Sequence, residues 1–203
     1  NTTASDNTGV GANSLGVNTT GTRNTSVGSD SLDANTEGND NTAVGKNSLS
    51  ANTTAGSGTA VGKGALQTNT TGGDNTAVGR SALELNTTGA NCTAVGRDAL
   101  KANTTASNNT AVGDRCLDVN TTGANNTGVG KGALGSNTTG ANNTVMGKNA
   151  GTAVTTGATN TLIGSVCHDN LTEGSLNTAL GYNLAPSAVD VDSEIVIGSS
   201  ITG

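Results

Sequence analysis

The sequence predicts an all-β protein, a parallel β-roll or β-solenoid of twelve 17-residue coils. The first observation is a glycine that returns every 17 residues without an insertion, from Gly11 to Gly198. The second is an aliphatic residue before each of these glycines, which is valine in the first eight coils. The third is a β-branched threonine two residues before the aliphatic residue, an alternation typical of a short strand. A fixed period of this length indicates stacked units that bury their apolar side against their neighbours.

The strand is the first element of each coil. We number the positions of a coil from 1 to 17, so that residues 120–136 form coil 8. Positions 7 to 10, residues 126–129 in that coil, form the expected strand, with positions 8 and 10 on one face. We assign position 10 to the core, where stacking would produce one continuous ladder: Val10, Val27, Val44, Val61, Val78, Val95, Val112, Val129, Met146, Ile163, Leu180 and Ile197.

Glycine then ends the strand in a tight corner. A φ above zero is open to glycine at low cost, which explains the invariant residue at position 11 of every coil. Positions 14 to 17 are expected to form a second short strand, and position 4, often glycine, a second corner. The corner glycines at position 11 are Gly11, Gly28, Gly45, Gly62, Gly79, Gly96, Gly113, Gly130, Gly147, Gly164, Gly181 and Gly198.

Asparagine recurs at position 7, just before the strand. Stacked coils bring like residues above like, so each asparagine is expected to hydrogen-bond its own copy one coil away. At about 4.8 Å per coil, twelve coils give a rod of about 57 Å. The asparagines concerned are Asn24, Asn41, Asn75, Asn109, Asn126 and Asn143.

The last coils depart from the pattern. We divide the chain into regular coils over residues 1–153 and divergent terminal coils of the same solenoid over residues 154–203. Leucine at position 15 gives way in the last four coils to Gly151, His168, Ala185 and Thr202, and Pro186 enters where no earlier coil has a proline.

The repeated motif Asn-Thr-Ala-Val-Gly-x-x-Ala-Leu, as at residues 75–83, resembles the head repeats of YadA-type trimeric autotransporter adhesins. It is also similar to repeats in the shafts of some phage tail fibres. The resemblance covers nearly the whole chain. It implies a left-handed coil, a homotrimer, and an extracellular location, at a cell surface or in a virion fibre. The small residue at position 9 is compatible with the second buried face that a trimer requires.

The amino-acid composition limits the classes of binding partner that we expect. Nine basic residues against fifteen acidic ones argue against nucleic acid. The chain has no Trp or Phe and only Tyr182, so the aromatic anchors of many recognition surfaces are missing. No run of about 18 apolar residues exists, so this segment is not expected to span a membrane.

Few residues in the sequence could form a catalytic or metal-binding site. The single histidine, His168, adjoins Cys167, and neighbouring residues of a strand point to opposite faces, so they form no nucleophile–base pair. Asp190, Asp192 and Glu194 alternate as a calcium site would require, but solvated carboxylates are the interpretation that we favour. We therefore expect no enzyme, no catalytic residue, no cofactor and no metal.

Two surface ladders are the candidate binding sites. The first is basic, follows the corner at position 12, and would suit a cell-surface glycan or another anionic host surface: Lys46, Lys63, Arg80, Arg97, Lys131 and Lys148. The second lies at position 3, where outward threonines resemble those of ice-binding β-solenoids: Thr54, Thr71, Thr88, Thr105, Thr122 and Thr139. The sequence therefore predicts a structural or adhesive fibre segment that spaces or presents a binding surface. The alternative is an ice-binding solenoid that uses the threonine ladder.

Overall fold

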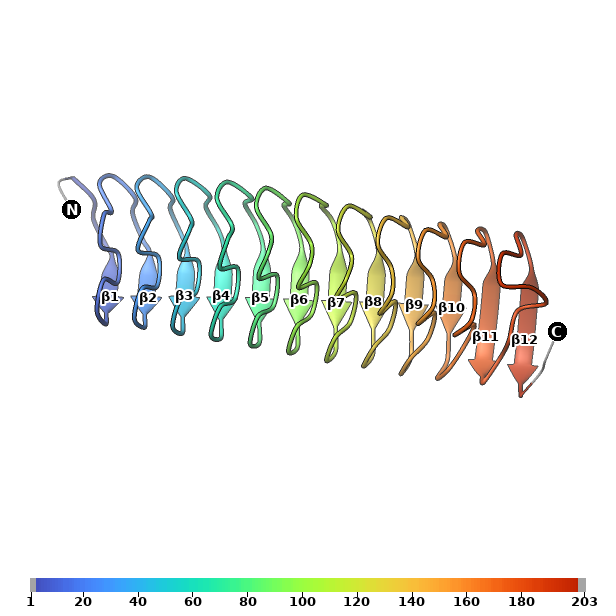
Figure 1. The fold of residues 1–203 in the computed structure, drawn as a ribbon. Coiled ribbons are helices and arrows are strands. Elements are labelled where there is room, and N and C mark those ends of the chain that lie inside the picture. The colour runs from blue at the N-terminus through green and yellow to red at the C-terminus, as the bar shows by residue number, and fades with distance from the viewer. Residues whose placement is uncertain (1–2, 201–203) are drawn as a thin grey trace.

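One short strand per coil builds the fold. The computed structural model describes residues 3–200 and shows twelve strands in one parallel sheet, in the order β1 to β12 (Figure 1). The strands are β1 (Thr8–Val10), β2 (Thr25–Val27), β3 (Thr42–Val44), β4 (Thr59–Val61), β5 (Thr76–Val78), β6 (Thr93–Val95), β7 (Thr110–Val112), β8 (Thr127–Val129), β9 (Thr144–Met146), β10 (Thr161–Ile163), β11 (Thr178–Tyr182) and β12 (Ile195–Ser199).

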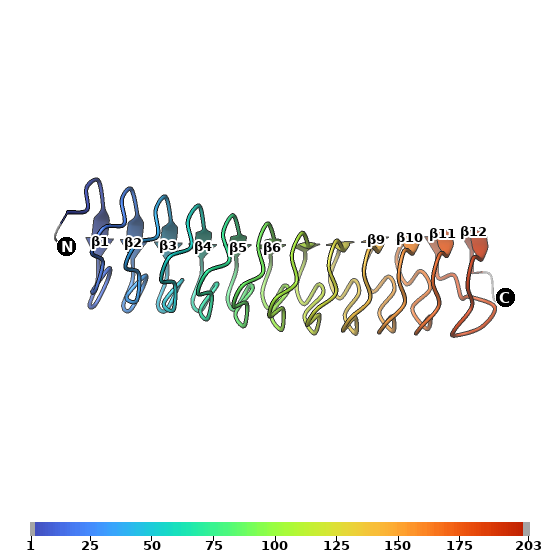
Figure 2. The same cartoon turned by 90° about the horizontal axis from the view of Figure 1, so that it is seen from above.

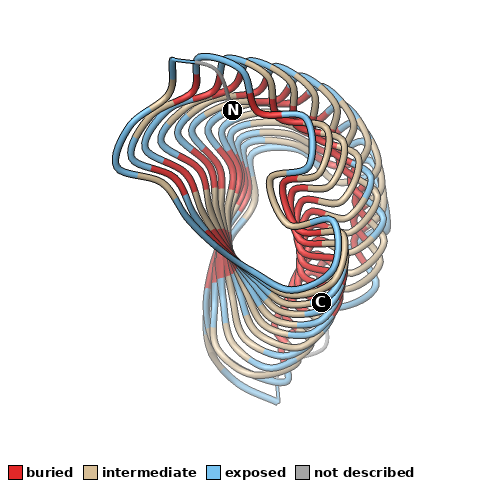
Figure 3. Ribbon diagram, turned by 90° about the vertical axis from the view of Figure 1, so that its left-hand side faces the viewer, coloured by how far each residue is buried: buried red, intermediate tan, exposed pale blue. Residues whose placement is uncertain are grey.

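The register of the sheet follows the repeat. Each strand pairs with the next in parallel, and every residue faces its counterpart 17 positions on, as Thr76 faces Thr93 and Val78 faces Val95. The strands form one side of the rod and the connecting turns form the other (Figure 2). Seen from its N-terminal end, the rod shows coils stacked behind one another, with buried residues at equivalent places (Figure 3). The predicted β-solenoid is confirmed.

The face assigned to the core was wrong. The position-10 side chains point outward, and ten of them are between 36% and 65% exposed, while Val95 and Val129 are half-buried. The correction applies to the whole ladder: Val10, Val27, Val44, Val61, Val78, Val95, Val112, Val129, Met146, Ile163, Leu180 and Ile197. Position 9 faces inward instead, because the leucine at position 15 fills the interior and leaves room only for a small residue opposite.

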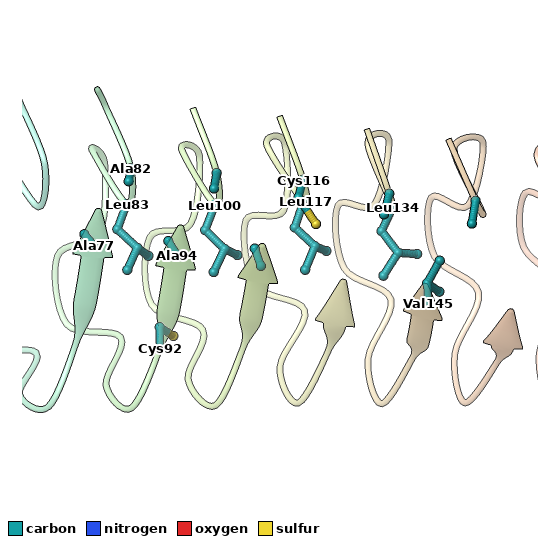
Figure 4. Packing of buried hydrophobic residues seen from close by; sticks show 14 of the residues in the cluster. Ala77, Ala82, Leu83, Cys92, Ala94, Leu100, Cys116, Leu117, Leu134 and Val145 are labelled. Atoms are coloured by element: carbon teal, nitrogen blue, oxygen red, sulfur yellow. The ribbon is translucent and has the colours of Figure 1, made fainter. Parts of the chain in front are cut away.

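The core therefore consists of alanines on the strand packed against leucines from the turns. Ala77 and Ala94 on the strands are fully buried, as are Leu83 and Leu100. Figure 4 shows the leucines in one row along the rod, beside the strand alanines. Leu117 and Leu134 continue that row. Burial of a leucine is worth about 1.5–3 kcal/mol, so this row supplies most of the apolar stabilisation of each coil.

Core side chains compensate one another in size between adjacent coils. Gly128 stands at position 9 beside Cys116 of the preceding coil, and a Cβ there would lie 2.6 Å from the Cys116 sulfur. Leu162 replaces the usual alanine at position 9 where Gly151 replaces the usual leucine. A Cβ on Gly151 would lie 3.0 Å from a Leu162 methyl carbon. Interiors pack at near-crystalline density, and these exchanges keep the volume of each layer constant.

The expected second strand at positions 14 to 17 is absent from the described coils. That segment is a succession of turns in which the leucine itself adopts a left-handed conformation, with φ of 50° at Leu100. Positions 6 and 13 are left-handed as well, as at Asn91 and Asp98. These turns still bond from coil to coil, since the Leu100 amide donates to the Cys116 carbonyl at 3.0 Å. Leucine at position 15 thus points inward from a turn rather than from a strand.

The two corners need glycine for different reasons. Position 11 has the predicted positive φ in all twelve coils, 138° at Gly96. Position 4 does not have a positive φ, but a Cβ on Gly89 would overlap the Ala106 carbonyl oxygen and lie 2.5 Å from Asn86 Oδ1. Glycine there permits close stacking, although alanine is accommodated at Ala55 and Ala106.

Buried asparagines bond the coils at position 7, as predicted. The backbone amide of Asn41 donates to Asn24 Oδ1 at 2.9 Å, and Asn24 Nδ2 donates to the Gly38 carbonyl at 2.8 Å. The Asn24 side chain thereby bonds one backbone amide and one backbone carbonyl of the following coil. The bonds to a copy one coil away recur at Asn126 and Asn143.

A second buried asparagine ladder, at position 1, was missed. Asn86 Nδ2 donates to Asn69 Oδ1 at 2.7 Å and to the Gly89 carbonyl at 2.9 Å, and Asn86 Oδ1 accepts from Asn103 Nδ2 at 2.9 Å. The same side-chain bond joins every coil between Asn18 and Asn137. The ladder ends at Asn137, whose Oδ1 has no hydrogen-bond partner among the described residues, because the next coil has Val154 at this position.

The terminal coils continue the same sheet with longer strands. β11 and β12 each run through the corner glycine for five residues and pair from Thr178–Ile195 to Tyr182–Ser199. Residues 3–200 contain no helix, so none that could cross a membrane is found there.

Candidate functional site

The basic residues gather on one edge of the rod. Eight of the nine lie at positions 12 to 16 of coils 3 to 9, and we call this set the basic edge: Lys46, Lys63, Arg80, Arg97, Lys101, Arg115, Lys131 and Lys148. Four acidic residues share those positions in the same coils: Glu84, Asp98, Asp114 and Asp118. The rest of the chain has only Arg23 against eleven acidic residues. An acidic protein therefore carries a locally cationic edge.

Ion pairs neutralise only part of that edge. Arg97 donates to both oxygens of Asp114 at 2.7 and 3.1 Å, which holds the pKa of that carboxyl below its usual value. Arg80 lies 3.5 Å from Asp98, and Lys101 lies 3.5 Å from Glu84.

Four lysines of the edge form no ion pair with any residue that the structure describes: Lys46, Lys63, Lys131 and Lys148. All four are exposed.

A groove of about 210 Å³ lies within the basic edge, across coils 3 to 6. Its lining combines three cations with one carboxylate and three neutral polar side chains: Asn47, Lys63, Gly64, Gln67, Arg80, Ser81, Glu84 and Lys101. Gly64 occupies position 13, where the adjacent coils have Asn47 and Ser81, and its missing side chain opens the space between Lys63 and Lys101.

The position-3 threonines are exposed, but they lie on bends rather than on the sheet. The backbone amide of Thr88 donates to the Thr104 carbonyl at 3.3 Å, so this segment follows the turns of the next coil. The candidate residues Thr54, Thr71, Thr88, Thr105, Thr122 and Thr139 thus form an outward row at a corner of each coil.

The flat surface of the rod is the outward side of the sheet. We call it the sheet face and define it as positions 8 and 10 of the twelve strands, where threonine or Ile195 accompanies the aliphatic row. It carries no charged residue along its whole length. Sequence reasoning placed these valines in the core and so missed the surface. The signal that could have found it is the pairing of bulky leucine at position 15 with small residues at position 9.

The cysteines are buried and free. Burial raises the pKa of Cys116 to about 12 and that of Cys167 to about 11, while the pKa of Cys92 also rises for the same reason. The thiolate is the nucleophilic form, so these thiols are protonated at neutral pH. They pack as small core side chains.

His168 replaces leucine at position 15 and is fully buried between coils with smaller residues there, Gly151 and Ala185. Neither ring nitrogen has a hydrogen-bond partner among the described residues. Burial lowers the pKa of His168, opposed by a weaker effect of the Glu194 carboxylate. A lowered pKa in the folded state means that the unfolded chain binds the proton more tightly, so stability is lost as pH falls below about 6.5.

Replacing His168 with leucine is expected to raise the free energy of unfolding by about 1–3 kcal/mol at pH 7, because each unpaired buried polar atom is costly. The variant should also lose the decline in stability between pH 6.5 and pH 5. Urea unfolding at several pH values measures both effects, with Asp169→Asn, an exposed neighbour, as the control. A variant less stable than the parent, with the decline intact, would contradict this account.

Two of the three alternating carboxylates near the end of the chain, Asp192 and Glu194, accept hydrogen bonds from different backbone amides. Asp192 accepts from the Ser175 amide at 2.6 Å, and Glu194 accepts from the Ser187 amide at 3.1 and 3.2 Å. No group of three potential metal ligands occurs among residues 3–200. These two side chains therefore bond turns of the terminal coils.

No protein-family model, curated protein or solved structure matches this chain.

Proposed function

We propose that this chain is a segment of an extracellular fibre, a trimeric β-roll shaft or head of a surface adhesin or viral tail fibre that spaces or presents a binding surface. The observation that carries the proposal is the sheet face, an uncharged row of exposed aliphatic side chains from Val10 to Ile197. Monomeric soluble proteins seldom expose a continuous apolar surface of this length, and such surfaces mark interaction sites.

The dimensions of the sheet face suit a second copy of the rod. Eleven turns at about 4.8 Å and a three-residue strand of about 10 Å give an area of about 500 Å². Side chains flanking the strands bring this toward the roughly 800 Å² per partner that specific interfaces bury. The resemblance to YadA-type head repeats favours three copies over two.

The molar mass of the protein in solution tests the proposed trimer. Light scattering of the 19.5 kDa chain is expected to give about three chain masses. The double variant Val61→Lys/Val78→Lys should be monomeric with unchanged circular dichroism, because charged residues within an apolar interface cost several kcal/mol. Thr54→Lys/Thr71→Lys, on the exposed corners of the same coils, is the matched control and should leave the trimer intact.

A stable monomer of the parent chain would refute the trimer and favour the second candidate, an ice-binding solenoid. Regular rows of threonine and valine on a flat sheet support that candidate better at the sheet face than at position 3, whose threonines lie on bends. Coil 7 separates the two rows: Thr110→Tyr alters the sheet face and Thr105→Tyr the corner. Loss of ice shaping in one variant alone would identify the row. No ice shaping by the parent would remove this candidate.

A further inference from the structure

We propose that the groove in the basic edge binds an acidic polysaccharide, with the polymer lying along the rod and its anionic groups on Lys63, Arg80 and Lys101. This inference deepens the proposed function, in which the rod presents a binding surface, by naming the chemical class of the ligand.

Charge segregation is the first support. Cations repeated on successive coils stand about 4.8 Å apart and repel one another, which costs free energy unless an anion lies between them. Acidic residues are plentiful in this chain, yet eleven of fifteen lie away from the basic edge and Lys63 has no carboxylate within ion-pair distance among the described residues. The edge thus retains unpaired positive charge, as an anion-binding surface requires.

The groove supplies the polar groups that a sugar needs. The amides of Asn47 and Gln67 offer both donors and acceptors, and the Ser81 hydroxyl offers either. Glu84 lies 3.5 Å from Lys101 and Asp98 lies 3.5 Å from Arg80, so these two cations are partly neutralised, and Lys63 is the groove cation that no described carboxylate engages. A combination of cations with neutral hydrogen-bonding side chains fits a ligand that is anionic and rich in hydroxyl groups.

The groove lacks aromatic side chains, and this favours a polysaccharide over a nucleic acid as the ligand. Base recognition on single strands relies on aromatic stacking, and the one aromatic residue, Tyr182, lies in β11 and not in the groove. Lys46, Lys63, Arg80 and Arg97 occupy four consecutive coils. A polymer that lies along the rod can therefore contact cations of successive coils, with Lys46 and Lys63 free of any described ion pair.

Binding is tested by calorimetry with polygalacturonate, chondroitin sulfate, dextran and oligothymidylate. We expect polygalacturonate or chondroitin sulfate to bind and dextran not to bind, and the two acidic polymers separate carboxylate from sulfate recognition. Lys63→Gln/Arg80→Gln should weaken binding at least about tenfold through loss of two charge-assisted contacts. Arg23→Gln, which removes the one cation outside the edge, should bind as the parent does.

A second pair of variants separates the groove from charge alone. Gly64→Asn fills the groove without changing charge, and its backbone is compatible, since Asn47 and Asn149 adopt φ of 58° and 55° at the same position. It should weaken binding about threefold or more. Gly132→Asn makes the same change in coil 8, outside the groove, and should have no effect.

Three results would overturn the assignment. They are equal binding of dextran, unchanged affinity in Lys63→Gln/Arg80→Gln, and oligothymidylate binding as tight as that of the acidic polysaccharides. The outcome is distinguishable from that of the assembly test. A trimer that binds no polysaccharide refutes this site alone, and a monomer that binds refutes the assembly alone.

Discussion

Gly96→Val is expected to lower the free energy of unfolding by more than about 3 kcal/mol. Gly96 has φ of 138°, where a β-branched residue is strongly strained. A Cβ at this corner would overlap the Gly113 carbonyl oxygen and lie 2.6 Å from the Gly113 carbonyl carbon. Both atoms belong to the backbone of the next coil, so relief requires the stack itself to open.

Thermal unfolding followed by circular dichroism measures this effect, and Gly73→Ala is its matched control. Gly73 has no positive φ, and a Cβ there would meet only the Gly56 carbonyl oxygen at 3.4 Å. Alanine already occupies the same position at Ala90 and Ala124. The control should change stability by less than about 1 kcal/mol. Equal melting of the two variants would contradict the close stacking of coils at position 11.

Asn86→Ala is expected to cost about 2–5 kcal/mol. Removing this side chain leaves Asn69 Oδ1 without the donor that now lies at 2.7 Å, and it also removes the bonds to the Gly89 carbonyl and from Asn103 Nδ2, both of 2.9 Å. The Gly89 carbonyl still accepts from Asn75 Nδ2 at 2.7 Å. The orphaned buried acceptor costs about 1–3 kcal/mol, and each of the two other lost bonds costs about 0.5–1.5 kcal/mol. Urea unfolding with an unchanged m value would report this loss as a lower midpoint.

Val95→Ala, in strand β6 of the same coil, serves as the comparison. Val95 lies on the sheet face and is half-buried, so loss of its two methyl groups should cost below about 1 kcal/mol when the chain is monomeric. An effect larger than that of Asn86→Ala would mean that the sheet face is covered in solution. The same result in the monomeric Val61→Lys/Val78→Lys variant, whose sheet face is uncovered, would contradict the expected order of the two effects.

The period of 17 residues made the fold predictable, because a strand, an obligatory glycine and a bulky leucine recur in one register. The alternation at positions 8 to 10 shows that Thr93 and Val95 share a face opposite to Ala94, but not which face points inward. Valine is the more hydrophobic choice for a core, and it was assigned there. Contact with Leu100 decides the matter, since that leucine occupies the space facing the strand.

Other features depend on tertiary contacts that local rules do not contain. Leucine rarely adopts a left-handed conformation, so the turn around Leu100 was interpreted as a strand. Asn-Thr-Thr-Gly is typical of an exposed turn, which concealed the burial of Asn86. The 17-residue spacing predicted the six basic residues at position 12, but not Lys101 and Arg115, which complete the basic edge from other positions. The groove was not, because it arises from the absence of a side chain at Gly64 between neighbouring coils.

The asparagine ladder at position 1 has a mechanical consequence for a rod under tension. Force along the axis loads the bonds between coils, and the amides from Asn18 to Asn137 connect eight coils by one donor–acceptor chain. At Val154 and Leu171 that chain is replaced by apolar contact, which has no directional bond to resist extension. The junction between Asn137 and Val154 therefore depends on the strands and on the position-7 asparagines, where the Asn160 amide donates to Asn143 Oδ1 at 2.9 Å, and we expect it to open under load before the regular coils do.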